Sequence, residues 1–395
     1  MNAGSRIQVA LAKCASYEAS HLADAVGRLL ESIQCRPGHG TRILVKPNLL
    51  APSEPDHLPC THPLVVRAVC QHLTDLGATV RVGDSPTFGN AVEIAKKIGL
   101  TEALADLPVT IVNLDGVAPV HLSYGGWMAI SPGALENDLI VSVPKLKAHH
   151  QMRITGAVKN GYGCVPGLCK PLLHFLYGDR DARFERLFLE IWQRLPPSVS
   201  LMDAIVAMHV HGPTKGKPYP LGLLGASTSP LALDTAVMSI LGIDPDQAPL
   251  WRTALGLNMP GTLLEDLVYP LETPDSFDGA GFQTPRHLFP MSFRPLRVPG
   301  NDFGGEKREG AQESQGGIQN ARGWIFQEER RARWNGFSER PEVPSSRKDC
   351  AAANPETHTP CTKPKRYGRT LPEMPWPFAA QCSCQSGRDI SRWGD

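Results

Sequence analysis

Along the first 300 residues, segments with the hydrophobic spacing of helices alternate with segments whose hydrophobic pattern is typical of strands. Apolar side chains recur at helical spacing in residues 18–33 and 184–195, and short apolar runs typical of buried strands lie between such segments. The pattern predicts strands at residues 7–12, 41–48, 78–86, 109–114, 134–143, 199–208 and 221–226. It predicts helices at residues 18–33, 61–77, 94–100, 184–195, 230–242 and 251–257, a hairpin near residues 121–130, and extended chain at residues 267–297.

The order of these elements indicates an α/β fold. Strands that alternate with helices favour a mostly parallel sheet covered by helices on both faces, and ligands bind beyond the carboxyl ends of such strands. Lys46 and Asn48 end one predicted strand, and Asp84 ends another. Lys145 and Lys147 follow a third. We expect these side chains to meet at one edge of the sheet.

Residues 143–174 carry positive charge without a negative counterpart. They contain five lysines or arginines and three histidines, and no carboxylate occurs between Asp138 and Asp179. Four glycines among these charges permit close backbone approach. We interpret the stretch as a Gly-rich loop that binds a small anion. The alternative is a solvated surface whose carboxylate partners come from elsewhere in the fold.

The predicted site combines cationic, amide and titratable side chains. The residues expected to bind the anion are Lys46, Asn48, Lys145, Lys147, Lys159, Asn160 and His211. Imidazole titrates near neutral pH, so a histidine is the expected acid or base, with an aspartate orienting it or the substrate. The catalytic candidates are His149, His174, Asp84 and Asp203. For each of them, the alternative is an ordinary hydrogen-bonded or turn-capping residue.

The overall charge excludes a global attraction to nucleic acid or membranes. Forty lysines and arginines against 39 aspartates and glutamates give a net charge of +1. The basic stretch contains only Tyr162 as an interleaved aromatic residue, so no nucleic-acid partner is expected. The first residues do not resemble a signal peptide, and no run of about 18 apolar residues occurs. We predict a cytoplasmic protein with no membrane partner.

The ten cysteines are too sparse in 395 residues for a disulfide scaffold, and no Cys-x-x-Cys pair occurs. Cys164 and Cys169 lie in the basic stretch, where nearby lysines can lower the pKa of a thiol. Together with His149, His150 and His174 they are the candidate ligands for iron, nickel or zinc, and His209 and His211 are further candidates. The alternative for each cysteine is a structural, mainly hydrophobic role.

The composition changes near residue 300. Residues 301–395 are rich in Gly, Arg, Glu, Gln, Ser and Pro and lack sustained apolar periodicity, which predicts a low-complexity, disordered tail. We therefore place one α/β domain at residues 1–300 and the tail at residues 301–395. The tail is either a partner-binding segment or a terminus with no selected structure.

Short motifs follow one another in order along the domain. They are Lys46-Pro-Asn, Thr61-His-Pro, Gly83-Asp-Ser-Pro, Asn113-Leu-Asp, Pro144-Lys-Leu-Lys-Ala-His, Val158-Lys-Asn-Gly-Tyr-Gly-Cys-Val-Pro-Gly, Asp203-Ala-Ile-Val-Ala-Met, His211-Gly-Pro, Leu233-Asp-Thr-Ala and Leu241-Gly-Ile-Asp-Pro. In this order they resemble the signatures of DUF362, a family of domains of unknown function, over residues 6–298.

The resemblance implies a cytoplasmic α/β protein of the DUF362 type. Many members carry a ferredoxin-like iron–sulfur module, which implies redox or iron–sulfur-linked chemistry. This chain departs from them because it has no Cys-x-x-Cys-x-x-Cys run, and also at Ala148, where the family's motif has Thr. An iron–sulfur cluster would therefore reach it through a partner, and an electron-transfer protein is the partner implied.

Three functions compete on these grounds. The first is an enzyme that binds a small anionic substrate, with iron–sulfur-linked redox chemistry as the implied reaction class. The second is an accessory protein that handles metal ions or iron–sulfur clusters. The third is a non-catalytic protein that binds a partner through its tail. The polar residues expected at one edge of the sheet favour the enzyme.

Overall fold

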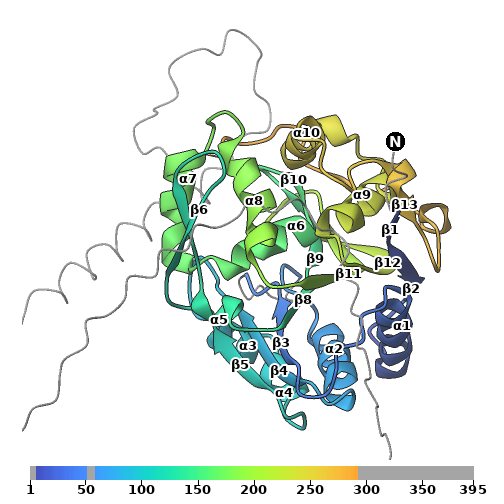
Figure 1. The fold of residues 1–395 in the computed structure, drawn as a ribbon. Coiled ribbons are helices and arrows are strands. Elements are labelled where there is room, and N and C mark those ends of the chain that lie inside the picture. Colours follow the sequence, from blue (N-terminus) through green and yellow to red (C-terminus); the bar gives the residue numbers. More distant parts are fainter. Residues whose placement is uncertain (1–5, 51–57, 292–395) are drawn as a thin grey trace, which may run out of the picture. The chain divides into compact units, whose positions relative to one another are not determined.

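A nine-stranded sheet forms the centre of the fold (Figure 1). The computed structural model describes residues 6–50 and 58–291, which lie within one compact unit, Met1–Asp302. The strand order is β10-β9-β11-β8-β3-β4-β5, with β12 beside β11 and β2 beside β12. The bounds are β2 (Ala10–Lys13), β3 (Arg42–Pro47), β4 (Thr79–Asp84), β5 (Thr110–Asn113), β8 (Leu139–Val143), β9 (Lys145–His149), β10 (Arg153–Thr155), β11 (Ser198–His209) and β12 (Lys217–Ser227). Two smaller sheets pair β1 (Ile7–Gln8) with β13 (Leu267–Val268), and β6 (Ala118–His121) with β7 (Trp127–Ile130).

The central sheet is mixed. Strands β5, β4, β3, β8 and β11 run parallel to one another. Strand β12 is antiparallel to β11, β2 to β12, and β10 to β9. The prediction of a mostly parallel sheet is therefore wrong. Only residues 210–216 join β11 to β12, and so short a connection reverses the chain without the crossover that parallel strands need.

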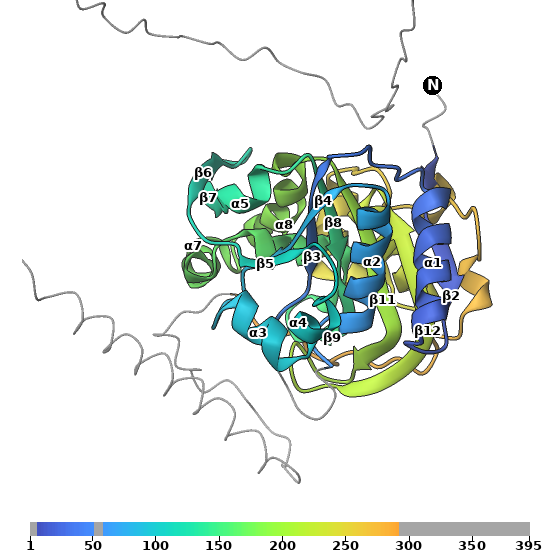
Figure 2. The same ribbon diagram turned by 90° about the horizontal axis from the view of Figure 1, so that it is seen from below.

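Helices pack against both faces of the sheet, and each face has its own hydrophobic core. One core contains residues of α1 (Ala19–Ser32), α2 (Pro63–Asp75), α3 (Ala91–Lys97) and α4 (Leu100–Ala103). The other contains residues of α5 (Pro132–Leu135), α6 (Ala157–Asn160), α7 (Lys170–Tyr177), α8 (Arg183–Arg194), α9 (Pro230–Ile240) and α10 (Pro249–Gly256). In β3, Ile43 and Val45 point into the first core and Leu44 into the second, as strand alternation requires. Figure 2 shows α1 and α2 side by side on the first face.

The strand predicted at residues 134–143 is shorter than expected. It begins only at Leu139, because Pro132 starts the short helix α5. The side chain of Asn137 donates hydrogen bonds to the carbonyl oxygens of Gly133 (2.8 Å) and Ala134 (3.1 Å), which closes this helical turn. The apolar run thus includes a helix end and a strand, which hydrophobicity alone does not separate.

The basic stretch is not the Gly-rich loop that the sequence predicts. It forms β9, β10, α6, two short 3₁₀ turns (Gly161–Cys164 and Gly167–Cys169) and α7. In β9, Leu146 and Ala148 lie in a hydrophobic core, while Lys145 and Lys147 alternate with them and are also buried. The loop prediction is wrong because Leu146 and Ala148 pack into the core as part of a strand, which also buries the lysines that alternate with them. The alternative of a solvated surface does not hold for Lys145 and Lys147 either.

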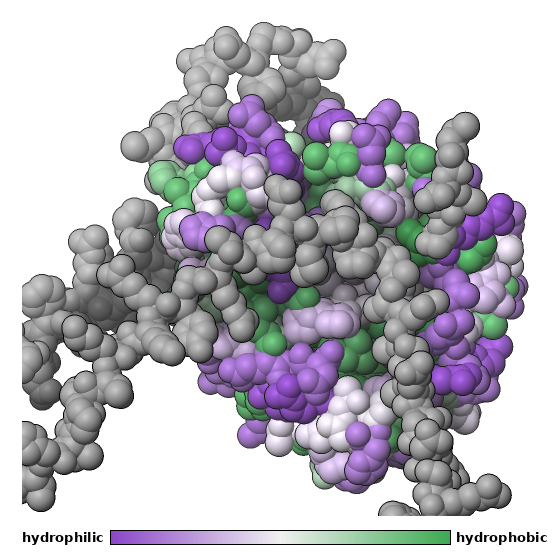
Figure 3. Space-filling view, viewed as in Figure 1, coloured by the Kyte–Doolittle hydropathy of each residue, from purple (hydrophilic) through white to green (hydrophobic). Residues whose placement is uncertain are grey.

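The surface shows no single dominant patch on the face drawn in Figure 3, where hydrophilic side chains spread around the margin and hydrophobic ones lie among them. Within residues 6–50 and 58–291, none of the helices combines the length and the hydrophobicity needed to cross a membrane. The tail predicted at residues 301–395 lies outside the described residues. The polar side chains that could form a site lie in the interior of the described part of the chain.

Candidate functional site

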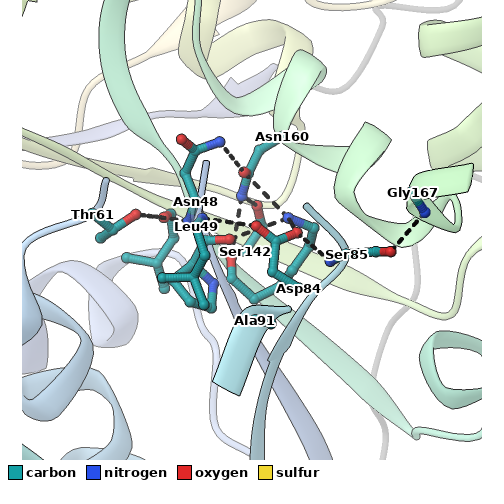
Figure 4. A network of polar contacts seen from close by, with 12 residues as sticks. Asn48, Leu49, Thr61, Asp84, Ser85, Ala91, Ser142, Asn160 and Gly167 are labelled. Atoms are coloured by element: carbon teal, nitrogen blue, oxygen red, sulfur yellow. Dashed lines mark hydrogen bonds and ion pairs between the residues drawn. The ribbon is translucent and has the colours of Figure 1, made fainter. Parts of the chain in front are cut away.

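Lys46 and Asp84 form an ion pair in the protein interior. They lie at the carboxyl ends of the neighbouring parallel strands β3 and β4, and the Lys46 Nζ–Asp84 Oδ1 distance is 2.9 Å. Figure 4 shows Asp84 within the network of polar contacts that surrounds it. The Asp84 carboxylate also accepts hydrogen bonds from the backbone N–H groups of Leu49 (2.7 Å) and Ser85 (2.9 Å). Lys46 donates a further hydrogen bond to Asn160 Oδ1 (3.3 Å). The carboxylate is thus fully engaged within the protein.

Asn160 connects β3, β8 and the segment that follows β3. Its Nδ2 donates hydrogen bonds to the Lys46 carbonyl oxygen (3.1 Å) and Ser142 Oγ (2.8 Å), and its Oδ1 accepts one from Asn48 Nδ2 (3.3 Å). Asn48 Oδ1 in turn accepts a hydrogen bond from Lys147 Nζ at 2.5 Å. We call Lys46, Asn48, Asp84, Ser142, Lys147 and Asn160 the polar network. The structure brings five residues predicted for the site together here.

The segment that precedes α2 closes the network from one side. Thr61 Oγ1 donates a hydrogen bond to the Val143 carbonyl oxygen (2.6 Å) and accepts one from Asn48 N (2.8 Å). The Pro59 carbonyl oxygen accepts a second hydrogen bond from Lys147 Nζ (2.8 Å). Among the described residues, Lys147 therefore donates to two neutral oxygens, which leaves one of its three N–H bonds for another acceptor.

A buried carboxylate fixes α6, the helix that carries Lys159 and Asn160. Asp234 accepts hydrogen bonds from the backbone N–H groups of Ala157 (2.6 Å) and Val158 (2.9 Å), which are otherwise unpaired at a helix start. Burial raises the pKa of Asp234 to about 7, although these two hydrogen bonds act in the opposite direction. Gly156 must be glycine here because a Cβ would lie 2.7 Å from Asp234 Cγ.

Lys145 and Asp203 belong to a second buried cluster. The Lys145 Nζ–Asp203 Oδ2 distance is 2.9 Å, and Tyr17 OH accepts a hydrogen bond from Lys145 (2.9 Å) while donating one to Asp203 Oδ1 (3.0 Å). The backbone N–H of His62 also donates to Asp203 (3.0 Å), and the His62 ring stacks on Tyr17 at 3.6 Å. Every charge in this cluster is paired. Its contacts are those of a structural support beside the polar network.

Three further lysines are surrounded by protein without a carboxylate contact in the part of the chain that the structure describes. We call Lys147, Lys159 and Lys170 the cationic cluster. Lys170 Nζ donates a hydrogen bond to the Ser85 carbonyl oxygen, and Lys159 Nζ lies over the Phe188 ring, 5.5 Å from its centre. Desolvation lowers the pKa of Lys147 to about 7 and the pKa of Lys159 and of Lys170 to about 8. Among residues 6–50 and 58–291, the positive charge of the cluster has no carboxylate in direct contact, although Asp84 interacts with Lys147 and Lys170 at longer range.

His149 is buried next to this cluster in one defined tautomer. Its Nδ1 accepts hydrogen bonds from the backbone N–H groups of Gln151 (3.1 Å) and Met152 (3.3 Å), so the proton of the neutral ring lies on Nε2. Burial and the positive charge of Lys159 lower the pKa of His149 well below its ordinary value. At neutral pH the ring is uncharged and offers one N–H donor at Nε2.

His174 has the opposite tautomer. Its Nδ1 lies 2.7 Å from the Met291 carbonyl oxygen, which can only accept, so the proton lies on Nδ1 and the lone pair on Nε2. Burial lowers the pKa of His174 to about 4, and the charges of Lys159 and Lys170 add to the effect. Two histidines near Lys159 thus differ in role: His149 can donate at Nε2, and His174 can accept.

The remaining predicted site residues lie outside the polar network. His211 is exposed, and its ring stacks on His150 with 5.6 Å between centres. Burial raises the pKa of Cys164 to about 11, and it also raises the pKa of the half-buried Cys169, which favours thiols over metal-binding thiolates. Within the described residues, no three His, Cys, Asp or Glu side chains are placed to hold one metal ion. The metal role of these cysteines stays a prediction.

Several residues in these clusters were missed by sequence reasoning. Thr61 and His62 form a quoted motif, yet their chemical role depends on backbone contacts that the motif does not show. Lys170 is one of the charges of the basic stretch, but nothing local indicates that it is buried. Ser142 and Tyr17 had no signal, because each acts through partners more than 15 residues away in the chain.

The family described as Domain of unknown function (DUF362) matches residues 43–239. All six residues of the polar network lie in this range. The chain belongs to the DUF362 family. A relative from Synechocystis sp., a thylakoid-associated protein, is 34% identical over 302 residues, which are 75% of this chain and 93% of the relative. The family resemblance of the sequence motifs is confirmed.

Two solved structures share part of the fold. The lactate racemase apoprotein of Thermoanaerobacterium thermosaccharolyticum has 15% identity and a TM-score of 0.41, over 60% of this chain and 58% of that chain. A protein of Thermotoga maritima has 13% identity and a TM-score of 0.39, over 55% and 57% of the two chains. The chain spans less than two thirds of either structure, and neither likeness bears on its activity.

Proposed function

We propose that this DUF362 protein is an enzyme that binds a small anionic substrate, a carboxylate or a phosphate, at the cationic cluster. The observation that carries the proposal is the charge balance of the interior. Asp84 and Asp203 pair with Lys46 and Lys145, while the ammonium groups of the cationic cluster contact only neutral oxygens and aromatic rings among the described residues.

A buried ammonium without a counter-ion is costly, and its lowered pKa is the sign of that cost. An anion next to Lys147 would offset the desolvation of its ammonium group and raise its pKa. His149 adds an uncharged donor through Nε2, and Lys147 has one N–H bond that no described residue accepts. These donors suit two oxygens of a carboxylate or phosphate group.

The two histidines supply the acid–base chemistry in this proposal. The tautomer of His174 presents an acceptor, and its low pKa keeps the ring unprotonated at neutral pH. Both rings are near Lys159, whose charge contributes to the lowered pKa of each. His174 is therefore the proposed proton acceptor, and His149 the hydrogen-bond donor to the substrate.

Iron–sulfur-linked electron transfer through a partner stays a prediction, and so does the cytoplasmic location. The thylakoid association in the name of the Synechocystis relative supports looking for the protein in membrane fractions as well. Fractionation of cells that express the full chain, in low and in high salt, would show which location holds.

Anion-dependent thermal unfolding tests the proposal. Inorganic phosphate, acetate and propionate would be compared at constant ionic strength, with chloride as the balancing anion. An anion at a hundredfold excess over Kd should raise Tm by about 5 °C. The increase should disappear in Lys147→Met and Lys159→Met but persist in Lys97→Met, whose lysine is exposed on α3. Equal behaviour of all four proteins with every anion would overturn the proposal.

A further inference from the structure

Lys159 differs from every other lysine of the interior in what its amine touches. Lys46, Lys145, Lys147 and Lys170 each donate at least one hydrogen bond to a protein oxygen. Lys159 makes none within the described residues, and its amine lies over the face of Phe188, 5.5 Å from the ring centre. It is also half-buried, so part of the side chain stays accessible although the surrounding protein desolvates the amine.

The amine lies against a cluster of packed aromatic rings. Phe188 packs on Tyr162 with 4.8 Å and on Phe184 with 5.0 Å between ring centres. The His174 ring lies 4.2 Å from Phe184 on the same cluster. An apolar wall of this kind favours the uncharged amine, and the opposing acceptor that normally holds a lysine ammonium is missing among the described residues.

The backbone that carries Lys159 is fixed on both sides. Asp234 caps the N–H groups of Ala157 and Val158, and the Val158 carbonyl oxygen accepts a hydrogen bond from Trp192 Nε1 (2.8 Å). The next residue, Asn160, is held by the polar network. A lysine without hydrogen-bond partners on such a rigid helix is positioned in advance for a reaction partner.

The fraction of reactive amine follows from the environment. With a pKa of about 8, about one tenth of the Lys159 amine is uncharged at pH 7, against less than roughly a thousandth for an ordinary lysine. An uncharged lysine amine attacks carbonyl carbon. The positive charge of Lys159 contributes to the lowered pKa of both Lys147 and His149, so the donors proposed for the anion lie near its amine.

We infer that Lys159 is the nucleophile of the site and forms an imine with a 2-oxo carboxylate. The inference rests on the proposed function, because Lys147 and His149 would hold the carboxylate next to the carbonyl carbon. The Nζ lone pair attacks that carbon to give a carbinolamine. Loss of one water molecule, made from the carbonyl oxygen and the two amine hydrogens, then leaves the C=N bond. No oxidant or reductant takes part.

Reductive trapping tests the inference on the full chain. The protein would be incubated with pyruvate and sodium cyanoborohydride near pH 7.5, and the modified residue located by peptide mass spectrometry. We expect one adduct, at Lys159, formed at least ten times faster than at any exposed lysine. Excess propionate, which has the carboxylate but no carbonyl carbon, should slow it. The adduct should persist in Lys97→Met and be lost in Lys159→Arg.

The outcomes separate the two proposals. If anions raise Tm and no adduct forms at Lys159, the anion site stands and the imine is overturned. Adducts spread over exposed lysines, or placed at Lys170, overturn it equally. If anions fail to raise Tm and no adduct forms, both proposals fail. The adduct is located by mass spectrometry on the protein without substitutions, so the test does not depend on whether Lys159→Arg folds.

Discussion

The ion pair between Lys46 and Asp84 leaves no room for a side chain at Gly163. The backbone of Gly163 passes so close that a Cβ there would overlap Asp84 Oδ1 and Lys46 Nζ and would lie 2.6 Å from Lys46 Cε. The glycine in the basic stretch is thus required by the buried ion pair. Glycine is needed because the backbone passes close to other atoms, as the sequence indicates. Those atoms belong to the protein's own Asp84 and Lys46 and not to a bound ligand.

Substitution Gly163→Ala should destabilise the protein strongly. The added methyl group must displace a buried lysine or aspartate, and overpacking of this kind costs about 2–3 kcal/mol. The control is Gly256→Ala in α10, where a Cβ meets nothing within 4 Å and stability should be unchanged or up to about 1 kcal/mol higher. Urea unfolding of both variants measures the difference. Equal midpoints would contradict the close packing at Gly163.

The cost of burying Lys159 should depend on pH. Its pKa is lowered from 10.5 to about 8, so the unfolded chain binds more protons than the folded protein between these values. The destabilisation caused by burying Lys159 is absent above pH 10.5, grows as pH falls, and is complete below about pH 8. Lys159→Met has no ammonium group to bury. Its free energy of unfolding minus that of the original sequence should therefore increase by on the order of 2 kcal/mol between pH 10 and pH 7. Parallel pH profiles would contradict the desolvation of Lys159.

Asp203 should contribute to folding more than to anion binding. Asp203→Asn leaves the buried Lys145 without its carboxylate, at a cost of about 3 kcal/mol. Tyr17→Phe, which keeps the ring that stacks on His62, should cost about 1–2 kcal/mol. The anion-induced rise in Tm should survive in Tyr17→Phe. If Asp203→Asn kept full stability and lost that rise, Asp203 would take part in the chemistry, as the sequence predicts.

The sequence predicts most elements of the fold but not the partners of its charges. Lys145 and Lys147 are two residues apart and share one face of β9, yet they belong to different clusters. The register between β9 and β11 places Asp203 opposite Lys145, and a local pattern contains no information on such a register. Two lysines in one motif therefore indicate a site, but the motif does not show which of them forms an ion pair with a carboxylate.

Burial of charge explains the errors in the basic stretch. The alternation of Lys145, Leu146, Lys147 and Ala148 is the pattern of a strand with one apolar face, but lysines are seldom buried, so the charges and glycines of this stretch favour a loop. The mixed sheet was missed for another reason. The residues that join β11 to β12 contain Gly and Pro, which mark a turn but leave the direction of the next strand open.

Two substitutions of His149 separate its two ring nitrogens. The amide oxygen of Asn can replace Nδ1 as acceptor of the Gln151 and Met152 N–H groups, whereas the longer amide of Gln can replace the donor at Nε2. His149→Asn should therefore keep the turn, fold with a loss of less than about 1 kcal/mol, and lose at least tenfold in affinity for the anion. His149→Gln should bind the anion better than His149→Asn, while it loses about 1–3 kcal/mol of stability because two buried N–H groups lose their acceptor. Urea unfolding and anion titration, measured on the same preparations, give both quantities. If the two variants rank alike in stability and in affinity, His149 acts through packing alone, and its Nε2–H is not a donor to the substrate.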